Sequence, residues 1–284
     1  MRILFVVPYA PSLIRVRPYQ LLRALARRGH QIVAASMWTN EEERRALEEM
    51  ACGGVSVVCE RMPAWASMVN CLKALPTGQP LQSLYSWQPS LMARLARLVR
   101  ETRFDVVHVE HVRGVQYGIR IKRLVGAEVP VVWDSVDCIS QLYRQASRHC
   151  RCLKGRLMGW IDAGRTEAIE AFAVGFFDTV LLTSAVDAEA IRRVARARGA
   201  PSPANLRILC NGVDLDYFAP GDAARESATL VFSGKISYHA NVTAVRRLIL
   251  EVMPLVWERR PDARLLVVGK NPPAAVCSLA TRCG

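Results

Sequence analysis

Two polar residues, Glu110 and His111, come directly after an apolar stretch at residues 105–109 (DVVHV) that is typical of a buried strand. Ligands of open parallel sheets bind outside the carboxyl ends of the strands. A carboxylate and an imidazole in that place could act as a general base or as an electrostatic stabiliser. One Glu-His pair is weak evidence by itself, and His108, flanked by valines within the stretch, is predicted to be a packed histidine.

Charged residues stand at two further places in the first part of the chain. Arg15 and Arg17 lie where a helix is predicted to begin, and the free N–H groups of a helix start favour anions. Arginines that are merely exposed fit this pattern equally well. Asp134 and Asp137 follow the apolar sequence PVVW. We interpret both as helix caps, with a sugar hydroxyl or a metal as the alternative ligand, although nothing else in the sequence indicates a metal.

The last part of the chain repeats a Gly-Lys step after two apolar runs. Gly234-Lys235 follows the sequence TLVFS, and Gly269-Lys270 follows the sequence RLLVV. Glycine lets the backbone approach a ligand closely, and lysine supplies positive charge for a phosphate. Either step alone would be an ordinary turn. Two of them on successive strand ends predict an anionic ligand.

These residues need a sheet to bring them together, and the N-terminal sequence predicts its first unit. Residues 3–7 form a branched apolar run, and residues 31–36 (QIVAAS) form the next one. Between them a helix is expected from Arg17, with Pro18 in its first turn and Gly29 at its end. Strand, helix and strand in so short a span are typical of an α/β fold.

The alternation of apolar runs and amphipathic segments continues to about residue 210. Ser184 is expected to cap a helix, with Asp187 completing a capping box. Residues 59–90 carry four prolines and are interpreted as irregular. The remaining predictions are helices at residues 91–103 and 114–125 and strands at residues 130–133, 179–183 and 206–210.

A second lobe is predicted after a linker at residues 216–228. It has strands at residues 229–233 and 264–268, a helix over residues 242–258 that Pro254 should kink or end, and a helix over residues 275–283. Two strands are few for a doubly wound lobe. We therefore expect domains at residues 1–215 and 216–284, and an α/β fold of two Rossmann-like doubly wound lobes, the second incomplete.

The composition excludes several classes of protein. With 51% hydrophobic and 22% charged residues, the chain is not disordered. No apolar run approaches the roughly 18 residues of a membrane span, and the first run stops at Pro8, so no signal peptide is expected. Nine cysteines without CxxC pairs suit a reducing cytosol better than a disulfide scaffold. We expect a cytoplasmic protein.

The net charge of +13 at pH 7 predicts an anionic partner. No nucleic-acid-binding motif is present, so nucleic acid is not the expected partner. Residues 144–165 combine six basic residues with leucine, isoleucine and tryptophan. Such a stretch can lie on an anionic membrane, and a plain surface helix is the alternative. Residues 149–152 (HCRC) lack a second cysteine pair, so we do not interpret them as a metal cluster.

Four segments carry a family likeness, and through them the chain resembles glycosyltransferases of the GT-B fold, of the family 4 type (group-1 sugar transferases). They are residues 25–33 (LARRGHQIV), residues 211–220 with Asn211-Gly212-Val213-Asp214, residues 231–235 (VFSGK) and residues 261–269 (PDARLLVVG). The likeness runs nearly end to end, but it covers only the front of the second lobe.

The resemblance implies a division of labour between the lobes. Residues 1–215 would hold the acceptor, and residues 216–284 would begin the domain for a nucleotide-diphosphate sugar. By the same likeness Gly234 and Lys235 would bind the donor diphosphate. Glu110 or His111 would line the acceptor cleft, and Asn211 and Gly212 would lie near the hinge. Lysine and backbone N–H groups can stabilise a departing diphosphate, so neither a metal nor another cofactor is expected. Retention of anomeric configuration is the family expectation.

The sequence departs from the family in two places. Residues 8–17 contain no glycine, and the family's two glutamates separated by seven residues would lie beyond Gly284. We therefore expect a fragment of a longer reading frame. The predicted function is hexosyl transfer in polysaccharide biosynthesis, from a nucleotide-sugar to a glycan or lipid-linked acceptor, with peripheral attachment to the inner face of the membrane. A non-catalytic remnant that binds acceptor or membrane is the alternative, and the missing G-x-G-x-x-G disfavours a nicotinamide-dependent oxidoreductase.

Overall fold

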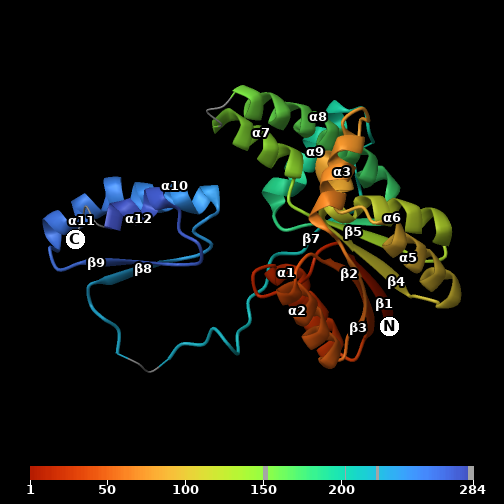
Figure 1. The fold of residues 1–284 in the computed structure, drawn as a ribbon, viewed down its shortest axis with the longest axis horizontal. Coiled ribbons are helices and arrows are strands. Elements are labelled where there is room, and N and C mark those ends of the chain that lie inside the picture. The colour runs from red at the N-terminus through yellow and green to blue at the C-terminus, as the bar shows by residue number, and fades with distance from the viewer. Residues whose placement is uncertain (150–152, 202, 222–223, 281–284) are drawn as a thin grey trace. The chain divides into compact units, whose positions relative to one another are not determined.

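The computed structural model describes residues 1–149, 153–201, 203–221 and 224–280. It divides into two compact units, Met1–Tyr217 and Phe218–Gly284, two residues from the boundary expected between residues 215 and 216. Figure 1 shows the course of the chain through both units. Within the described residues, no helix combines the length and the apolar character that crossing a bilayer requires.

The first unit is built on a parallel sheet of seven strands in the order β3-β2-β1-β4-β5-β6-β7 (Figure 1). The α/β class expected from the alternating pattern is therefore confirmed. The strands are β1 (Arg2–Val7), β2 (Gln31–Trp38), β3 (Ser56–Arg61), β4 (Val106–Glu110), β5 (Val131–Val136), β6 (Thr179–Leu182) and β7 (Leu206–Ile208). The helices are α1 (Val16–Arg27), α2 (Glu41–Cys52), α3 (Ala64–Ala74), α4 (Leu81–Tyr85), α5 (Pro89–Glu101), α6 (His111–Val125), α7 (Ile139–His149), α8 (Leu153–Phe176) and α9 (Ala185–Ala197).

The central strand β1 is buried on both faces, which explains its continuous apolar sequence. Successive side chains of a strand point to opposite faces. Leu4 and Val6 join the larger core under α5, α6, α8 and α9, whereas Phe5 and Val7 join a smaller core with Leu22 of α1 and Met50 of α2. The helices on both faces therefore hold the sheet in place and leave its carboxyl edge to carry polar residues.

The expectation of an irregular stretch at residues 59–90 is wrong, because three of its four prolines begin helices instead of breaking them, and the fourth, Pro76, lies in the turn after α3. Pro63 and Pro80 are the N-caps of α3 and α4, and Pro89 stands at the start of α5. At these positions the missing N–H would have no helical partner in any case. The sequence analysis also did not identify α2, nor β3 as a strand.

Two predicted helix boundaries are confirmed. Gly29 follows the end of α1 with a φ of +80°, the left-handed conformation that glycine adopts without strain. Ser184 caps α9, because its hydroxyl oxygen accepts a hydrogen bond of 3.1 Å from the Asp187 backbone N–H.

The second unit contains a two-stranded parallel sheet of β8 (Thr229–Ser233) and β9 (Arg264–Val268). Its helices are α10 (His239–Arg247), a π-helix at Leu248–Val252, α11 (Met253–Arg259) and α12 (Ala274–Ala280). The predicted helix over residues 242–258 is interrupted by the π-helix, and Pro254 lies in the first turn of α11 directly after it. Among the described residues the strands pair only with each other, and Val231 and Val268 are exposed.

The loops after β8 and β9 approach each other so closely that only glycine fits at position 269. A Cβ atom there would lie 1.9 Å from the Gly234 carbonyl oxygen and 2.7 Å from the side chain of Ile236. The Gly234 N–H also donates a hydrogen bond of 3.1 Å to the Val268 carbonyl. Gly269 therefore has a packing role that brings the two Gly-Lys steps together.

We expect Gly269→Ala to destabilise the second unit by roughly 1–3 kcal/mol, because the methyl group would overlap backbone atoms that cannot move independently. Amide hydrogen exchange of β8 and β9 measures the effect. Gly175→Ala in α8 is the control, since a Cβ there meets nothing within 4 Å. Equal exchange of β8 and β9 in the two variants would contradict this account.

Candidate functional site

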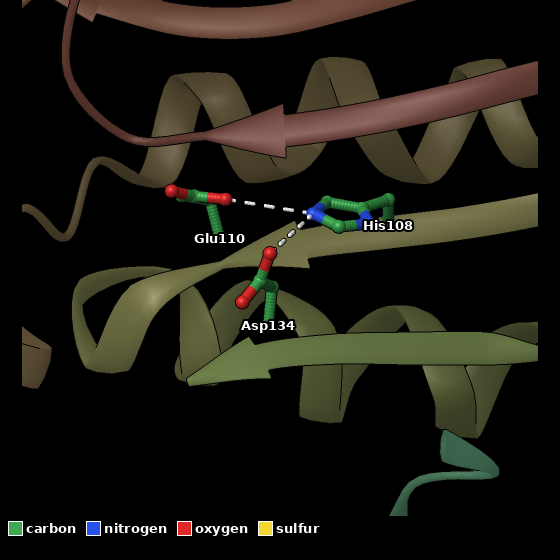
Figure 2. Close-up of side chains that lie close together, drawn as sticks. All are labelled: His108, Glu110 and Asp134. Carbon is green, nitrogen blue, oxygen red and sulfur yellow. Dashed lines mark hydrogen bonds and ion pairs between the residues drawn. The ribbon is translucent and has the colours of Figure 1, made fainter. Parts of the chain in front are cut away.

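Three polar side chains meet at the carboxyl edge of the first sheet, from the adjacent strands β4 and β5 (Figure 2). His108 Nε2 lies 3.5 Å from Glu110 Oε2 and 3.6 Å from Asp134 Oδ2. The register pairs Glu110 directly with Asp134, so the two carboxylates are neighbours across the strands. Both carboxylates are buried. His108 is packed, as predicted, because its ring stacks on Phe5 at 4.1 Å, but its Nε2 faces the two carboxylates.

Arg17 of α1 neutralises Asp134 through a bidentate pair. Its Nη2 donates to Asp134 Oδ2 at 2.8 Å and to Oδ1 at 3.1 Å, and its Nε donates to Oδ2 at 3.0 Å. Only 9% of the Arg17 side chain and none of the Asp134 side chain is exposed. In this arrangement Arg17 binds an internal carboxylate instead of a free anion.

The interpretation of Asp134 and Asp137 as helix caps is wrong. Asp134 lies within β5, and the Asp137 carboxylate accepts a hydrogen bond of 3.1 Å from the Thr183 hydroxyl. The first turn of α7 is instead held by Glu170 of α8, which accepts from the Ser140 N–H at 3.2 Å and also from the Ser140 hydroxyl. A distant carboxylate does the capping, which the local spacing could not reveal.

Burial and like charge act together on Asp134. Burial raises the pKa of its carboxyl above the usual value, and the neighbouring Glu110 raises it further, while His108 and Arg17 oppose the shift. Two carboxylates close together in a desolvated place cannot both carry charge without compensating cations. Arg17 therefore permits this pair of acids to exist in the fold.

Tyr9, in the loop after β1, closes the other side of Glu110. Its hydroxyl donates to Glu110 Oε1 at 3.3 Å. Burial raises the pKa of the phenol well above its usual value, and the charge of Glu110 adds to the shift, so Tyr9 stays a protonated donor. The guanidinium groups of Arg15 and Arg113 lie 5.1 Å and 6.0 Å from the centre of its ring. Arg15 also pairs with Glu43 at 3.0 Å.

Two residues directly at this edge have strained backbones. His111 has a φ of +62° and Val136 a φ of +70°, a region that non-glycine residues rarely adopt and that is especially costly for a β-branched one. The pairing of β5 with β6 shifts register between Asp134 and Val136. Strain of this kind persists where the surrounding structure enforces it, and it is concentrated at functional sites.

His111 is held as a neutral imidazole. Burial lowers its pKa to about 3, with a further contribution from Arg113. Its Nδ1 lies 3.4 Å from the Arg113 N–H, which donates to it, and its carbonyl oxygen accepts from Trp133 Nε1 at 3.2 Å. A neutral imidazole whose Nδ1 accepts the hydrogen bond from the Arg113 N–H carries its proton on Nε2, so at neutral pH His111 can offer one N–H donor but no positive charge.

Arg17 also reaches the end of the first unit. Its Nη1 donates to the Leu209 carbonyl at 3.0 Å and to Asn211 Oδ1 at 2.9 Å. A groove of about 540 Å³ lies between α1 and residues 210–216. Arg17, Asn211 and Gly212 line it, and so do Arg23, Arg27 and Asp214. The predicted hinge residues Asn211 and Gly212 thus lie in the same unit as the strand-end cluster, and Asn211 contacts it through Arg17.

The predicted phosphate residues lie in the second unit. Gly234 and Lys235 follow β8, Gly269 and Lys270 follow β9, and the parallel pairing places both steps at the same end of the small sheet. Both lysines are exposed. Asn241 of α10 donates to the Lys235 carbonyl at 3.0 Å and so helps to shape this loop.

The cluster on β4 and β5 has donor atoms that could hold a metal ion, since those of His108, Glu110 and Asp134 lie within 4.8 Å of one another. Arg17, however, already supplies the positive charge at Asp134 through three hydrogen bonds. A cation would have to share that carboxylate with a guanidinium. The expectation that the protein needs no metal stays a prediction, and residues 150–152 of the cysteine-containing segment lie outside the described residues.

The sequence analysis missed His108 Nε2 and Tyr9 as members of the site. Tyr9 stands in the first loop after a predicted strand, which was a usable signal. The orientation of His108 was not predictable, because its position between two valines is equally typical of a core residue.

A family model described as "Glycosyl transferase 4-like domain" matches residues 14–212. This range contains the whole cluster on β4 and β5 together with Arg17 and Asn211. No curated protein matches the sequence significantly.

Several solved structures resemble the chain. The N-terminal domain of trehalose-6-phosphate phosphatase from Candida albicans matches with a TM-score of 0.54 and 12% identity, over 99% of this chain and 67% of that one. UGT2 of Phytolacca americana, solved with UDP-2fluoro-glucose and pterostilbene, matches with a TM-score of 0.50 and 12% identity, over 96% and 71%. A putative UDP-N-acetylglucosamine 2-epimerase from Listeria monocytogenes matches with a TM-score of 0.49 and 13% identity, over 99% and 65%. The chain therefore spans about two thirds of the length of these proteins.

We expect Arg17→Met to lower the free energy of unfolding of the first unit by about 3–5 kcal/mol, because it leaves a buried carboxylate without its partner. Urea denaturation measures the loss. Arg44→Met is the matched control, since Arg44 pairs with exposed glutamates of its own helix and should cost less than about 1 kcal/mol. Similar losses in both variants would show that the Arg17 pair is not the anchor described here.

Proposed function

The chain belongs to the glycosyl transferase 4-like family and has the GT-B type of fold, and on this basis we propose that it transfers a sugar from a nucleotide-diphosphate sugar to a glycan or lipid-linked acceptor. The observation that carries the proposal is the buried cluster of His108, Glu110 and Asp134 at the carboxyl edge of the first sheet. In this fold class that edge is where ligands bind.

In the proposed reaction the first unit holds the acceptor. Glu110 and the neutral His111 stand at the strand end. Glu110 can accept a hydrogen bond from an acceptor hydroxyl, and the Nε2–H of His111 can donate one to the same oxygen, which orients it toward the sugar. The bond from the sugar to the diphosphate breaks as the bond to the acceptor oxygen forms. For retention, attack from the face that the diphosphate leaves needs no protein nucleophile, and the departing phosphate oxygen can take the acceptor proton.

The second unit would bind the donor diphosphate. Gly234 and Gly269 let the loops after β8 and β9 come close together, and Lys235 and Lys270 are exposed beside them. Positive charge and backbone N–H groups there would stabilise the diphosphate as negative charge develops on it. We therefore propose that the transfer reaction needs no metal ion.

Peripheral attachment to the inner face of the membrane belongs to the same proposal. Residues 144–165 are rich in basic side chains, and Trp160 within them is exposed. A basic amphipathic segment with an exposed tryptophan is suited to an anionic lipid surface. An acceptor embedded in that surface would then be close to the enzyme.

Lys235→Ala should weaken the binding of UDP- or GDP-sugars by about 10- to 100-fold, the loss expected when one charged hydrogen bond is removed. Isothermal calorimetry on the 284-residue chain measures it. Arg259→Ala is the control. It removes an exposed positive charge at the end of α11 and should leave the affinity for the nucleotide-sugar unchanged. Unchanged affinity in Lys235→Ala would overturn the donor site, and a lack of saturable binding by the unaltered chain would favour the non-catalytic alternative.

Glu110→Gln should lower kcat for sugar transfer by about 100-fold or more while leaving donor affinity unchanged, because the amide keeps an acceptor for Tyr9 but loses the negative charge. Transfer from radiolabelled donor measures turnover. Glu60→Gln is the control, because Glu60 pairs with Arg94 away from the strand-end cluster. Turnover that stays within a factor of about two would exclude Glu110 from the chemistry.

A further inference from the structure

Helix α3, together with its C-cap residue Leu75, presents four large apolar side chains to the solvent. Trp65, Met68, Leu72 and Leu75 are 66%, 64%, 60% and 46% exposed. Their spacing of three and four residues places them on one side of a helix. We call these four residues the apolar face of α3.

The opposite side of α3 is small and polar, so the helix is inverted relative to an ordinary surface helix. Ser67 and Ala74 are buried, and the Asn70 side-chain amide donates to the Trp87 carbonyl at 2.7 Å. An amphipathic helix of a water-soluble domain turns its apolar stripe inward. The outward stripe of α3 therefore predicts a partner that takes it out of water.

The orientation of α3 is fixed by its neighbours. Arg165 of α8 donates to the Leu75 carbonyl at 2.7 Å, and Asp162 of the same helix accepts from the Leu81 N–H at the start of α4 at 2.8 Å. Two polar contacts thus hold the α3–α4 region against α8. The apolar face is a consequence of this packing and not of a loosely placed helix.

The segment that carries the apolar face and the segment at residues 138–161 contain basic residues but no acidic ones, although Arg94, Arg97 and Arg144 pair with Glu60, Glu101 and Glu167, which lie outside these segments. No aspartate or glutamate occurs between Glu60 and Glu101, or between Asp137 and Asp162, and each interval holds five arginines or lysines. Such a surface attracts an anionic one. It disfavours a second copy of the same face, because two like-charged surfaces would be brought together.

A short series of contacts connects this region with the candidate site. Tyr85 of α4 is exposed, and the guanidinium of Arg113 lies 5.3 Å from the centre of its ring and 6.0 Å from that of Tyr9. Tyr9 in turn donates to Glu110. A surface that covered the apolar face would therefore lie close to the strand end where the acceptor is proposed to bind.

We infer that the first unit docks on an anionic lipid bilayer through the apolar face of α3, with the acid-free segments supplying the electrostatic attraction. The tryptophan, methionine and leucine side chains enter the boundary between headgroups and acyl chains, and the basic residues stay among the headgroups. As far as it assigns a lipid-linked acceptor to the cluster at Glu110, the inference rests on the proposed function. The docking surface itself does not depend on sugar transfer, because it rests on the exposure of α3.

Sedimentation with vesicles tests the inference on the full chain. We expect binding to vesicles of equimolar phosphatidylcholine and phosphatidylglycerol, weaker binding to phosphatidylcholine alone, and weaker binding in high salt. Trp65→Gln/Leu72→Gln should reduce binding by about tenfold or more, because it removes the side chains that enter the lipid. The matched control Leu13→Gln/Val186→Gln alters two residues that are equally exposed elsewhere and should bind as the unaltered chain does.

Tryptophan emission gives a second readout. Adding the anionic vesicles should shift the emission to the blue. Trp65→Phe should reduce that shift while preserving binding, and the shift that remains should come from Trp160, which is also exposed. Undiminished binding by Trp65→Gln/Leu72→Gln would overturn the inference. It would also be overturned if that variant converted an oligomer to a monomer without weaker vesicle binding, since the face would then join copies of the chain.

Donor calorimetry on the same samples separates the two proposals. Vesicle binding that depends on the apolar face supports docking, even where the chain shows no saturable binding of a nucleotide-sugar and the proposed transfer fails. Saturable donor binding without face-dependent vesicle binding leaves the transferase proposal in place and overturns docking.

Discussion

The first unit depends on one buried ion pair, between Arg17 and Asp134. Asp134 lies beside Glu110 in a place without solvent, and such a pair of acids would be strongly unfavourable without a cation. Arg17 supplies that cation from α1, the helix on the other side of the first loop, and continues to Leu209 and Asn211. One guanidinium therefore joins the start, the middle and the end of the unit at the edge where the chemistry is proposed.

Local patterns predicted most strands of the sheet, because burial on both faces forces continuous apolar runs that differ from everything around them. Residues 3–7 and 31–36 lie within β1 and β2. The same reasoning failed for proline, which can either begin a helix or interrupt one. Proline at 63, 80 and 89 starts helices in this fold, and only the following residues, with their tertiary contacts, decide between a helix start and a loop.

The candidate site was predictable in its members but not in their contacts. Glu110, Asp134 and Arg17 were each identified from their places after apolar runs or at a helix start. Their association depends on the register that sets Glu110 opposite Asp134, and on a hydrogen bond between residues that are 117 positions apart. Neither register nor long-range pairing leaves a periodic trace in a single sequence. For that reason Asp134 looked like a cap, while Glu170, the actual holder of α7, went unnoticed.

The small sheet of the second unit has a consequence for handling the molecule. In the described part of the chain β8 and β9 bond only to each other, and apolar side chains such as Leu230, Val231, Leu266 and Val268 stand exposed on both of its faces. Unsatisfied peptide groups along a strand are a template onto which another polypeptide can add. We expect aggregation of concentrated protein to begin at the β8–β9 sheet. Dilution or a solubilising fusion partner would therefore protect the second unit more than the first.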